Sequence, residues 1–140
     1  MKILFWNCRV LGSKGNEELM KDLLRLVQPD IVLIQETKMQ KEAFLQVSAN
    51  FWKKGGRTVV SSRGASRGIG TLWGDQKFDI VDIKHCPHWI LTTLLQKDFN
   101  AQVRLFNLYV LAGYAEKKIV GTLFGMKEVI SWELSSLSEI

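Results

Sequence analysis

Cysteine and proline are both scarce in this chain of 140 residues, which contains two of each. Two cysteines, Cys8 and Cys86, are too few for the disulfide framework of a small secreted protein. Neither stands in a cysteine pair or a Cys/His cluster spaced like zinc ligands, so a zinc site is not expected. We expect reduced thiols in an intracellular protein, with the nucleus as a candidate compartment, rather than a secreted one.

Long apolar runs are absent as well, and no stretch approaches the length of a membrane span. The short apolar run at residues 3–6 is followed at once by Asn7 and Arg9, which does not fit a signal peptide. The sequence shows no repeat, low-complexity segment or linker. We therefore expect a soluble domain, or part of one, with no membrane partner.

Apolar residues are nevertheless plentiful: hydrophobic residues make up 46% of the chain and charged residues 24%. Five Trp and seven Phe supply large side chains, so a packed core is expected and disorder is not. The formal net charge is +5, which favours an anionic partner such as DNA or a phosphorylated ligand. Many ordinary domains carry a similar charge, so charge alone does not identify the partner.

The first third of the chain has the pattern of a strand, a helix and a strand. Residues 3–6 and 31–34 are short apolar runs typical of buried strands. Between them apolar residues recur at helical spacing after Asn16, the expected N-cap, and Pro29 ends the pattern. Such a unit predicts two parallel strands with a right-handed crossover. The ends of these strands, at Asn7 and Glu36, should then share the sheet edge where ligands commonly bind.

The rest of the chain reads as mostly antiparallel strands. Strands are predicted at residues 58–61, 69–73, 78–83, 89–95 and 103–109, joined by short polar connections typical of hairpins. This predicts a mixed sheet rather than a doubly wound one. A helix is predicted at residues 115–123, and the pattern loosens after Gly125.

Four segments, in this order and spacing, resemble the endonuclease/exonuclease/phosphatase superfamily, and especially the endonuclease domains of plant LINE-type retroelements. The segment Gln35-Glu36-Thr37-Lys38, after a Pro-Asp-Ile strand, is the most specific of them. The segments are residues 1–9, 28–38, 68–73 and 107–110. The resemblance implies an α+β fold of the α/β sandwich type, here a truncated deoxyribonuclease-I-like fold. It implies an incomplete domain at residues 1–124 and a divergent C-terminal tail at residues 125–140.

The resemblance also implies roles for five residues in phosphodiester chemistry. Glu36 matches the metal-binding glutamate, with Mg²⁺, or Mn²⁺ in its place, as the cofactor. Asn7 matches the asparagine beside that metal, which orients the glutamate and the phosphate. Tyr109 matches the tyrosine whose hydroxyl reaches the phosphate as an electrostatic donor. Arg9 and Lys38 match positions suited to further phosphate contacts, with DNA as the implied partner.

The sequence departs from the family after Tyr109. Leu111 and Ala112 replace the usual Pro-Asn pair, and nothing later matches the Gly-Asp-Phe-Asn-like or Ser-Asp-His motifs. Those motifs supply the aspartate that activates water and the catalytic histidine. We therefore expect a chain that is inactive or weakly active alone. The alternatives are a nucleic-acid-binding module without catalysis and a gene fragment with no selected function.

Each candidate residue also has a simpler structural interpretation. Glu36 could be a surface carboxylate at a strand end, and Tyr109 a core aromatic of a strand. His85 and His88 lie in a predicted strand connection, where a solvated or structural role is the usual one. The basic stretch could be a solvated loop face or a surface that contacts the DNA backbone. Its members are Lys53, Lys54, Arg57, Arg63 and Arg67.

Overall fold

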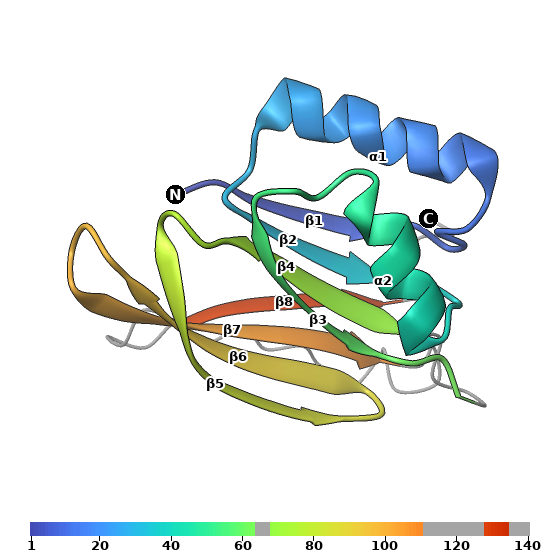
Figure 1. Cartoon of the computed structure of the whole chain (residues 1–140). Helices are drawn as coiled ribbons and strands as arrows, with labels where there is room; N and C mark the ends of the chain where they lie inside the picture. Colours follow the sequence, from blue (N-terminus) through green and yellow to red (C-terminus); the bar gives the residue numbers. More distant parts are fainter. Residues whose placement is uncertain (64–67, 111–127, 135–140) are drawn as a thin grey trace.

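A computed structural model describes residues 1–63, 68–110 and 128–134 of the chain. Its strands form two four-stranded sheets (Figure 1). The first sheet has the order β1-β2-β4-β3 and the second the order β5-β6-β7-β8. The elements are β1 (Ile3–Asn7), α1 (Lys14–Val27), β2 (Ile31–Gln35), α2 (Lys41–Ala49), β3 (Gly55–Val60), β4 (Ile69–Gly74), β5 (Phe78–Cys86), β6 (Trp89–Gln96), β7 (Ala101–Val110) and β8 (Glu128–Leu134).

The strand, helix and strand unit at the start of the chain is confirmed. β1 and β2 pair in parallel, with Ile3 opposite Ile31 and Asn7 opposite Gln35. Every residue of β2 is buried, as expected for a strand that is covered on both faces. β4 lies antiparallel to β2 and to β3, so the first sheet is mixed, as predicted.

The start of α1 differs from the prediction, because the N-cap is Ser13 rather than Asn16. The Ser13 hydroxyl accepts a hydrogen bond from the backbone amide of Asn16, at 3.4 Å. The side-chain amide of Asn16 instead donates to the carbonyls of Cys8 and Val10, at 2.8 and 2.7 Å. Asn16 therefore stabilises the loop between β1 and α1, which displaced it from the capping position that its residue type suggested.

The connection at residues 75–77 is a second correction, since it does not close a hairpin. β4 belongs to the first sheet and β5 to the second. Trp73 before the connection and Phe78 after it are both buried in one apolar cluster between the sheets. The chain therefore turns here from one layer to the other, because both aromatic side chains gain more burial between two sheets than in one. The later connection at residues 97–100 does close a hairpin, between β6 and β7.

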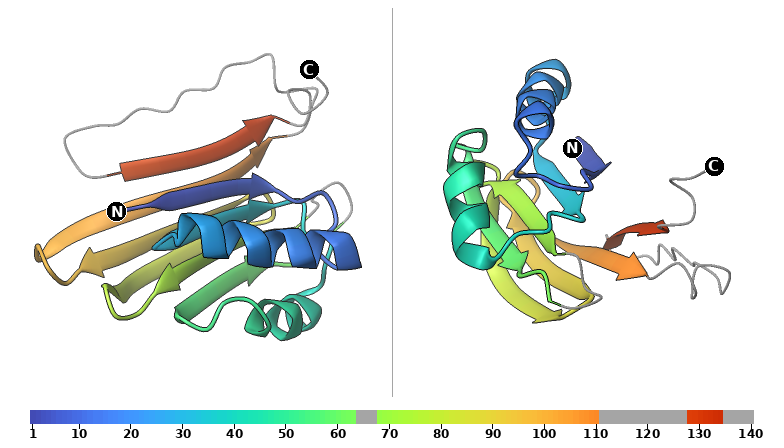
Figure 2. Two further views of the ribbon diagram at one scale, coloured as in Figure 1. Left: turned by 90° about the horizontal axis from the view of Figure 1, so that it is seen from above. Right: turned by 90° about the vertical axis from the view of Figure 1, so that its right-hand side faces the viewer.

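Both described helices lie on the face of the first sheet that points away from the second sheet (Figure 2). Met20 of α1 and Phe44 of α2 pack with Val32, Ile34 and Leu72 of the sheet. α2 and β8 had no counterpart in the prediction. The helix predicted at residues 115–123 lies outside the described residues.

The outer face of the second sheet carries apolar side chains. The residues of β6 alternate between buried and half-buried, so Ile90, Thr92 and Leu94 face the first sheet. Trp89 and Leu91 point the other way, beside Phe106, whose ring centroid lies 5.4 Å from that of Trp89. In the part of the chain that the structure describes, no helix covers this outer face. This agrees with the expectation of a sheet that exposes apolar surface.

Candidate active site

The ends of β1 and β2 lie together at one edge of the first sheet, as the sequence predicted. Asn7 pairs with Gln35, and the amide of Cys8 donates to the carbonyl of Gln35 at 3.0 Å. The Cys8 thiol lies 3.3 Å from the same carbonyl. Glu36 follows at once, so its carboxylate and the Asn7 amide belong to neighbouring strand ends.

The backbone at this edge takes an unusual conformation at several positions. Glu36 has a φ of 56°, Arg9 of 60° and Lys38 of 53°, all in the left-handed region. This region costs a residue with a side chain about 1 to 2 kcal/mol. Residues held in it against that cost cluster at functional sites in proteins. Three of the five candidate residues therefore share a feature that no sequence pattern revealed.

Gly68 supports these loops from the start of β4. Its carbonyl accepts a hydrogen bond from the amide of Thr37, at 3.1 Å. Its φ is 83°, and a Cβ placed there would overlap the Thr37 hydroxyl. Only glycine fits both the conformation and the space, and this fixes the segment that carries Glu36 and Lys38.

The Glu36 side chain is buried, with 4% of the residue exposed. Arg9 and Lys38 are exposed beside it, and both come from loops at the same edge. A buried carboxylate flanked by exposed cations is a suitable arrangement for an anionic ligand that a metal ion bridges to the protein.

Two buried polar atoms near Glu36 have no hydrogen-bond partner among the described residues. They are the Asn7 side-chain nitrogen and the Gln35 side-chain oxygen. The Asn7 oxygen accepts from the amide of Arg9, at 3.2 Å, so its nitrogen is the group left to donate. A buried polar group without a partner costs about 1 to 3 kcal/mol, which a ligand oxygen or a water molecule would recover.

Asn107 is a residue whose role the sequence did not reveal. It lies on β7 at a position that faces the first sheet, and it is fully buried. Its oxygen accepts from the Gln35 side chain at 3.2 Å, and its nitrogen donates to the carbonyl of Gly70 at 2.9 Å. The available signal was a polar residue in line with the buried Val103 and Leu105.

Tyr109 reaches the same edge from the second sheet. The Gln35 side chain donates to the carbonyl of Leu108 at 2.8 Å, and Tyr109 is the next residue along β7. The backbone of Tyr109 pairs with Glu133 of β8. The fold thus brings the backbone positions of Asn7, Glu36 and Tyr109 to one end of the two sheets.

The donor set limits which metal this edge can hold. Among the described residues, no three His, Cys, Asp or Glu side chains gather as a metal cluster. A site that relies on one carboxylate suits Mg²⁺, which commonly keeps several waters and binds substrate phosphates as further ligands. Glu36 fits that role. The pair His85 and His88 does not form such a cluster, and His85 lies within β5 rather than in a connection.

No helix in the described part of the chain is long and apolar enough to cross a membrane. No protein-family model and no curated protein matches the sequence.

Solved structures do share the fold. The human Nocturnin catalytic domain has a TM-score of 0.65 at 15% identity, over 84% of this chain and 52% of that one. The AP endonuclease LMAP from Leishmania major has a TM-score of 0.58 at 17% identity, over 78% and 40%. The Xenopus laevis APE2 catalytic domain has a TM-score of 0.57 at 18% identity, over 78% and 45%.

The chain therefore spans about half the length of the structures that it matches. Those structures belong to the endonuclease/exonuclease/phosphatase superfamily. This chain has their deoxyribonuclease-I-like fold.

Proposed function

We propose that this chain is a truncated, metal-dependent phosphodiesterase domain of the endonuclease type, of retroelement origin, and inactive or weakly active by itself. One observation carries the proposal. The buried, left-handed Glu36 lies beside the unpartnered Asn7 amide nitrogen, at the edge that β7 and Tyr109 also reach. The order of the motifs and the fold shared with nucleases support it.

In this proposal each residue has a separate task. Glu36 would hold Mg²⁺, or Mn²⁺, which supplies positive charge to a phosphodiester as negative charge develops on it. The Asn7 amide would donate to a phosphate oxygen, because its own oxygen already accepts from the Arg9 amide. Arg9 and Lys38 would attract and position the DNA backbone. The Tyr109 hydroxyl would be a further donor to the phosphate.

The low activity follows from the motifs that the sequence lacks. No matched residue supplies the aspartate that activates water or the catalytic histidine. Catalytic groups that act as a unit lose most of their effect when one is removed, with losses of about 10⁴ to 10⁶ in rate. Phosphate binding depends on fewer groups and would survive.

Nicking of supercoiled plasmid in the presence of Mg²⁺ tests the proposal. The parent chain is compared with Glu36→Ala and with the surface control Glu18→Ala on α1. We expect nicking that is weak at most and that disappears in Glu36→Ala while Glu18→Ala retains it. Turnover as fast as that of an intact nuclease would contradict the proposal, as would equal nicking by Glu36→Ala.

A second candidate is nucleic-acid binding without cleavage. The net charge of +5 and the exposed cations at the site edge favour it. Binding that falls steeply with salt and does not need metal, from a chain that never nicks, would identify this function. A chain that neither nicks nor binds would instead support a fragment with no selected function.

A further inference from the structure

A second concentration of positive charge lies at the opposite edge of the first sheet from Glu36. Two adjacent hollows there share Gln28, Lys53 and Lys54 in their lining. The hollow beside α1 has a volume of about 580 Å³ and is termed the basic groove. Its described lining consists of Lys21, Leu24, Arg25, Gln28, Asn50, Phe51, Lys53 and Lys54.

The charges around the basic groove are of one sign. Four of its lining residues are cations, and no Asp or Glu is among its described lining residues. The neighbouring hollow differs, because Asp30 and Asp75 line it together with Lys77. The Lys77 ammonium lies 2.8 Å from the Asp30 carboxylate. An anion should therefore prefer the basic groove to its neighbour.

The two walls of the basic groove differ in how available their cations are. On α1, Lys21 lies 3.6 Å from a Glu18 oxygen and Arg25 lies 2.7 Å from Asp22. Exposed ion pairs of this kind contribute about 0 to 1 kcal/mol, so a phosphate can compete for these cations. On the other wall, Lys53 is exposed and makes no ion pair within the described part of the chain.

Packing fixes the wall that carries Lys53 and Lys54. Trp52 is buried, and its indole N–H donates to the carbonyl of Trp73 at 3.2 Å. The Lys54 ammonium lies 5.6 Å from the centre of the Trp52 ring. The two lysines therefore follow directly from an anchored residue rather than from a free loop, so less entropy is lost when they bind a ligand.

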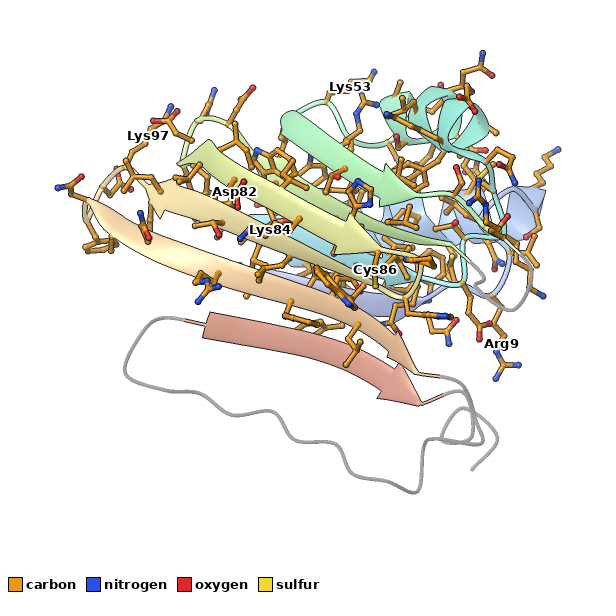
Figure 3. The ribbon with its side chains drawn as sticks, turned by 90° about the horizontal axis from the view of Figure 1, so that it is seen from below. Arg9, Lys53, Asp82, Lys84, Cys86 and Lys97 are labelled. Carbon is orange, nitrogen blue, oxygen red and sulfur yellow. The ribbon has the colours of Figure 1, made fainter. Side chains whose placement is uncertain are left out.

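We propose that the basic groove binds phosphates of a nucleic-acid backbone, as a second contact away from the Glu36 edge. This rests on the nucleic-acid partner of the proposed function. Five residues of β2 separate the two edges, which corresponds to about 17 Å at about 3.3 Å per residue. Figure 3 shows Lys53 well apart from Arg9. A strand held in the basic groove would thus extend the bound region of the nucleic acid without entering the candidate active site.

The open form of the groove favours a polymer over a small phosphate compound. Its cations come from two elements and face a broad hollow, so several phosphates in a chain can contact them at once. Each phosphate that a lysine or arginine neutralises releases counterions, and this makes binding strongly dependent on salt.

Binding of a fluorescently labelled single-stranded 12-nucleotide DNA, in EDTA, tests this inference. The parent chain is compared with Lys53→Glu/Lys54→Glu, with the milder Lys53→Gln/Lys54→Gln, and with Lys84→Glu/Lys97→Glu. The last variant makes the same change of charge on the second sheet, where Lys84 and Lys97 are exposed (Figure 3). Circular dichroism checks that each variant is folded.

We expect both double variants at Lys53 and Lys54 to weaken binding, by about tenfold or more for the glutamates, and to reduce the salt slope by about two. The Lys84/Lys97 control should change binding less and leave more of the slope. Equal weakening by the control would overturn the inference, because only net charge would then matter. Competition by pyrophosphate as effective as that by unlabelled DNA, phosphate for phosphate, would also overturn it in favour of a small phosphate ligand.

The result also separates this inference from the proposed function. Loss of DNA binding in the Lys53/Lys54 variants, in a chain that never nicks plasmid, would support the basic groove while contradicting catalysis. Nicking that depends on Glu36, with binding unaffected by both Lys53/Lys54 variants, would support catalysis and refute the basic groove.

Discussion

The side chain of Gln35, at the end of β2, donates to the side-chain oxygen of Asn107 on β7 across 3.2 Å. Both residues are buried, and they belong to different sheets. The contact lies one residue before Glu36 and two before Tyr109. It therefore links the two layers of the fold at the point where the candidate active site begins.

Replacement of Asn107 by leucine should destabilise the fold by about 3 kcal/mol. The change removes the acceptor of Gln35 and leaves the buried carbonyl of Gly70 without its donor. Urea denaturation measures the loss. Gln102→Ala is the matched control on the same strand, where the side chain is exposed, and should stay within about 0.5 kcal/mol. Equal effects of the two changes would contradict the linking role of Asn107.

Replacement of Gly68 by alanine should destabilise the fold by about 1 to 3 kcal/mol. The new Cβ would overlap the Thr37 hydroxyl, and the positive φ would be strained. Gly15→Ala is the opposite case, because nothing lies within 4 Å of a Cβ in this first turn of α1. It should stabilise the fold by about 0.5 to 1 kcal/mol. Thermal melts of both variants compare these effects, and a neutral Gly68→Ala would show that the loop adapts.

Mg²⁺ should raise the melting temperature of the parent chain and have little effect on Glu36→Gln. A ligand that binds only the folded state at about 100 times its Kd adds about 2.7 kcal/mol. The amide keeps the size of the side chain but removes the charge that a hard cation requires. Glu18→Gln, an exposed position on α1, should retain the full shift. A shift that persists in Glu36→Gln would place the metal elsewhere.

Asp30 should contribute to stability in a manner that depends on pH. Burial raises the pKa of Asp30, but the hydrogen bond from Lys77, the Lys2 amide and the nearby positive charges outweigh it. The pKa in the folded protein therefore lies below the ordinary value of 3.8. A lowered pKa stabilises the folded state above the ordinary value, and this contribution is lost as the pH falls through the folded pKa.

Urea denaturation of the parent and of Asp30→Asn, from about pH 6 down to about pH 2.5, measures this dependence. The parent should be the more stable of the two by a constant amount above about pH 4, and that difference should shrink below it. Asp22→Asn, in an exposed pair on α1, is the control and should show a smaller dependence. A difference that stays constant through the acid range would contradict the lowered pKa.

Much of the local structure could be predicted from residue patterns alone. The apolar runs before Asn7 and Glu36, with helical spacing between them, were enough to predict a parallel pair and a shared edge. The prediction misplaced the N-cap because Asn16 and Ser13 are both good capping residues, and only the contacts of Asn16 with the loop decide between them. It missed α2, whose apolar face is weak and whose burial rests mainly on Phe44.

Other features depend on contacts between residues far apart in the sequence. The turn of the chain from one sheet to the other after Gly74 depends on where Trp73 and Phe78 can both be buried. The role of Asn107 depends on Gln35, 72 residues away along the chain. The basic groove combines Lys21 and Arg25 of α1 with Lys53 and Lys54. A local pattern records none of these, because the partners meet only when the layers pack.

The sequence by itself determined the strand, helix and strand start, the edge that carries Asn7 and Glu36, and the family resemblance, since all three depend on short-range periodicity and motif order. Only the tertiary structure decided the division into two sheets, the unpartnered polar atoms beside Glu36, and the gathering of lysines at the opposite edge. The physical reason is that burial and charge are properties of a surface shared by several elements. The residues that form such a surface are set by packing rather than by their spacing along the chain.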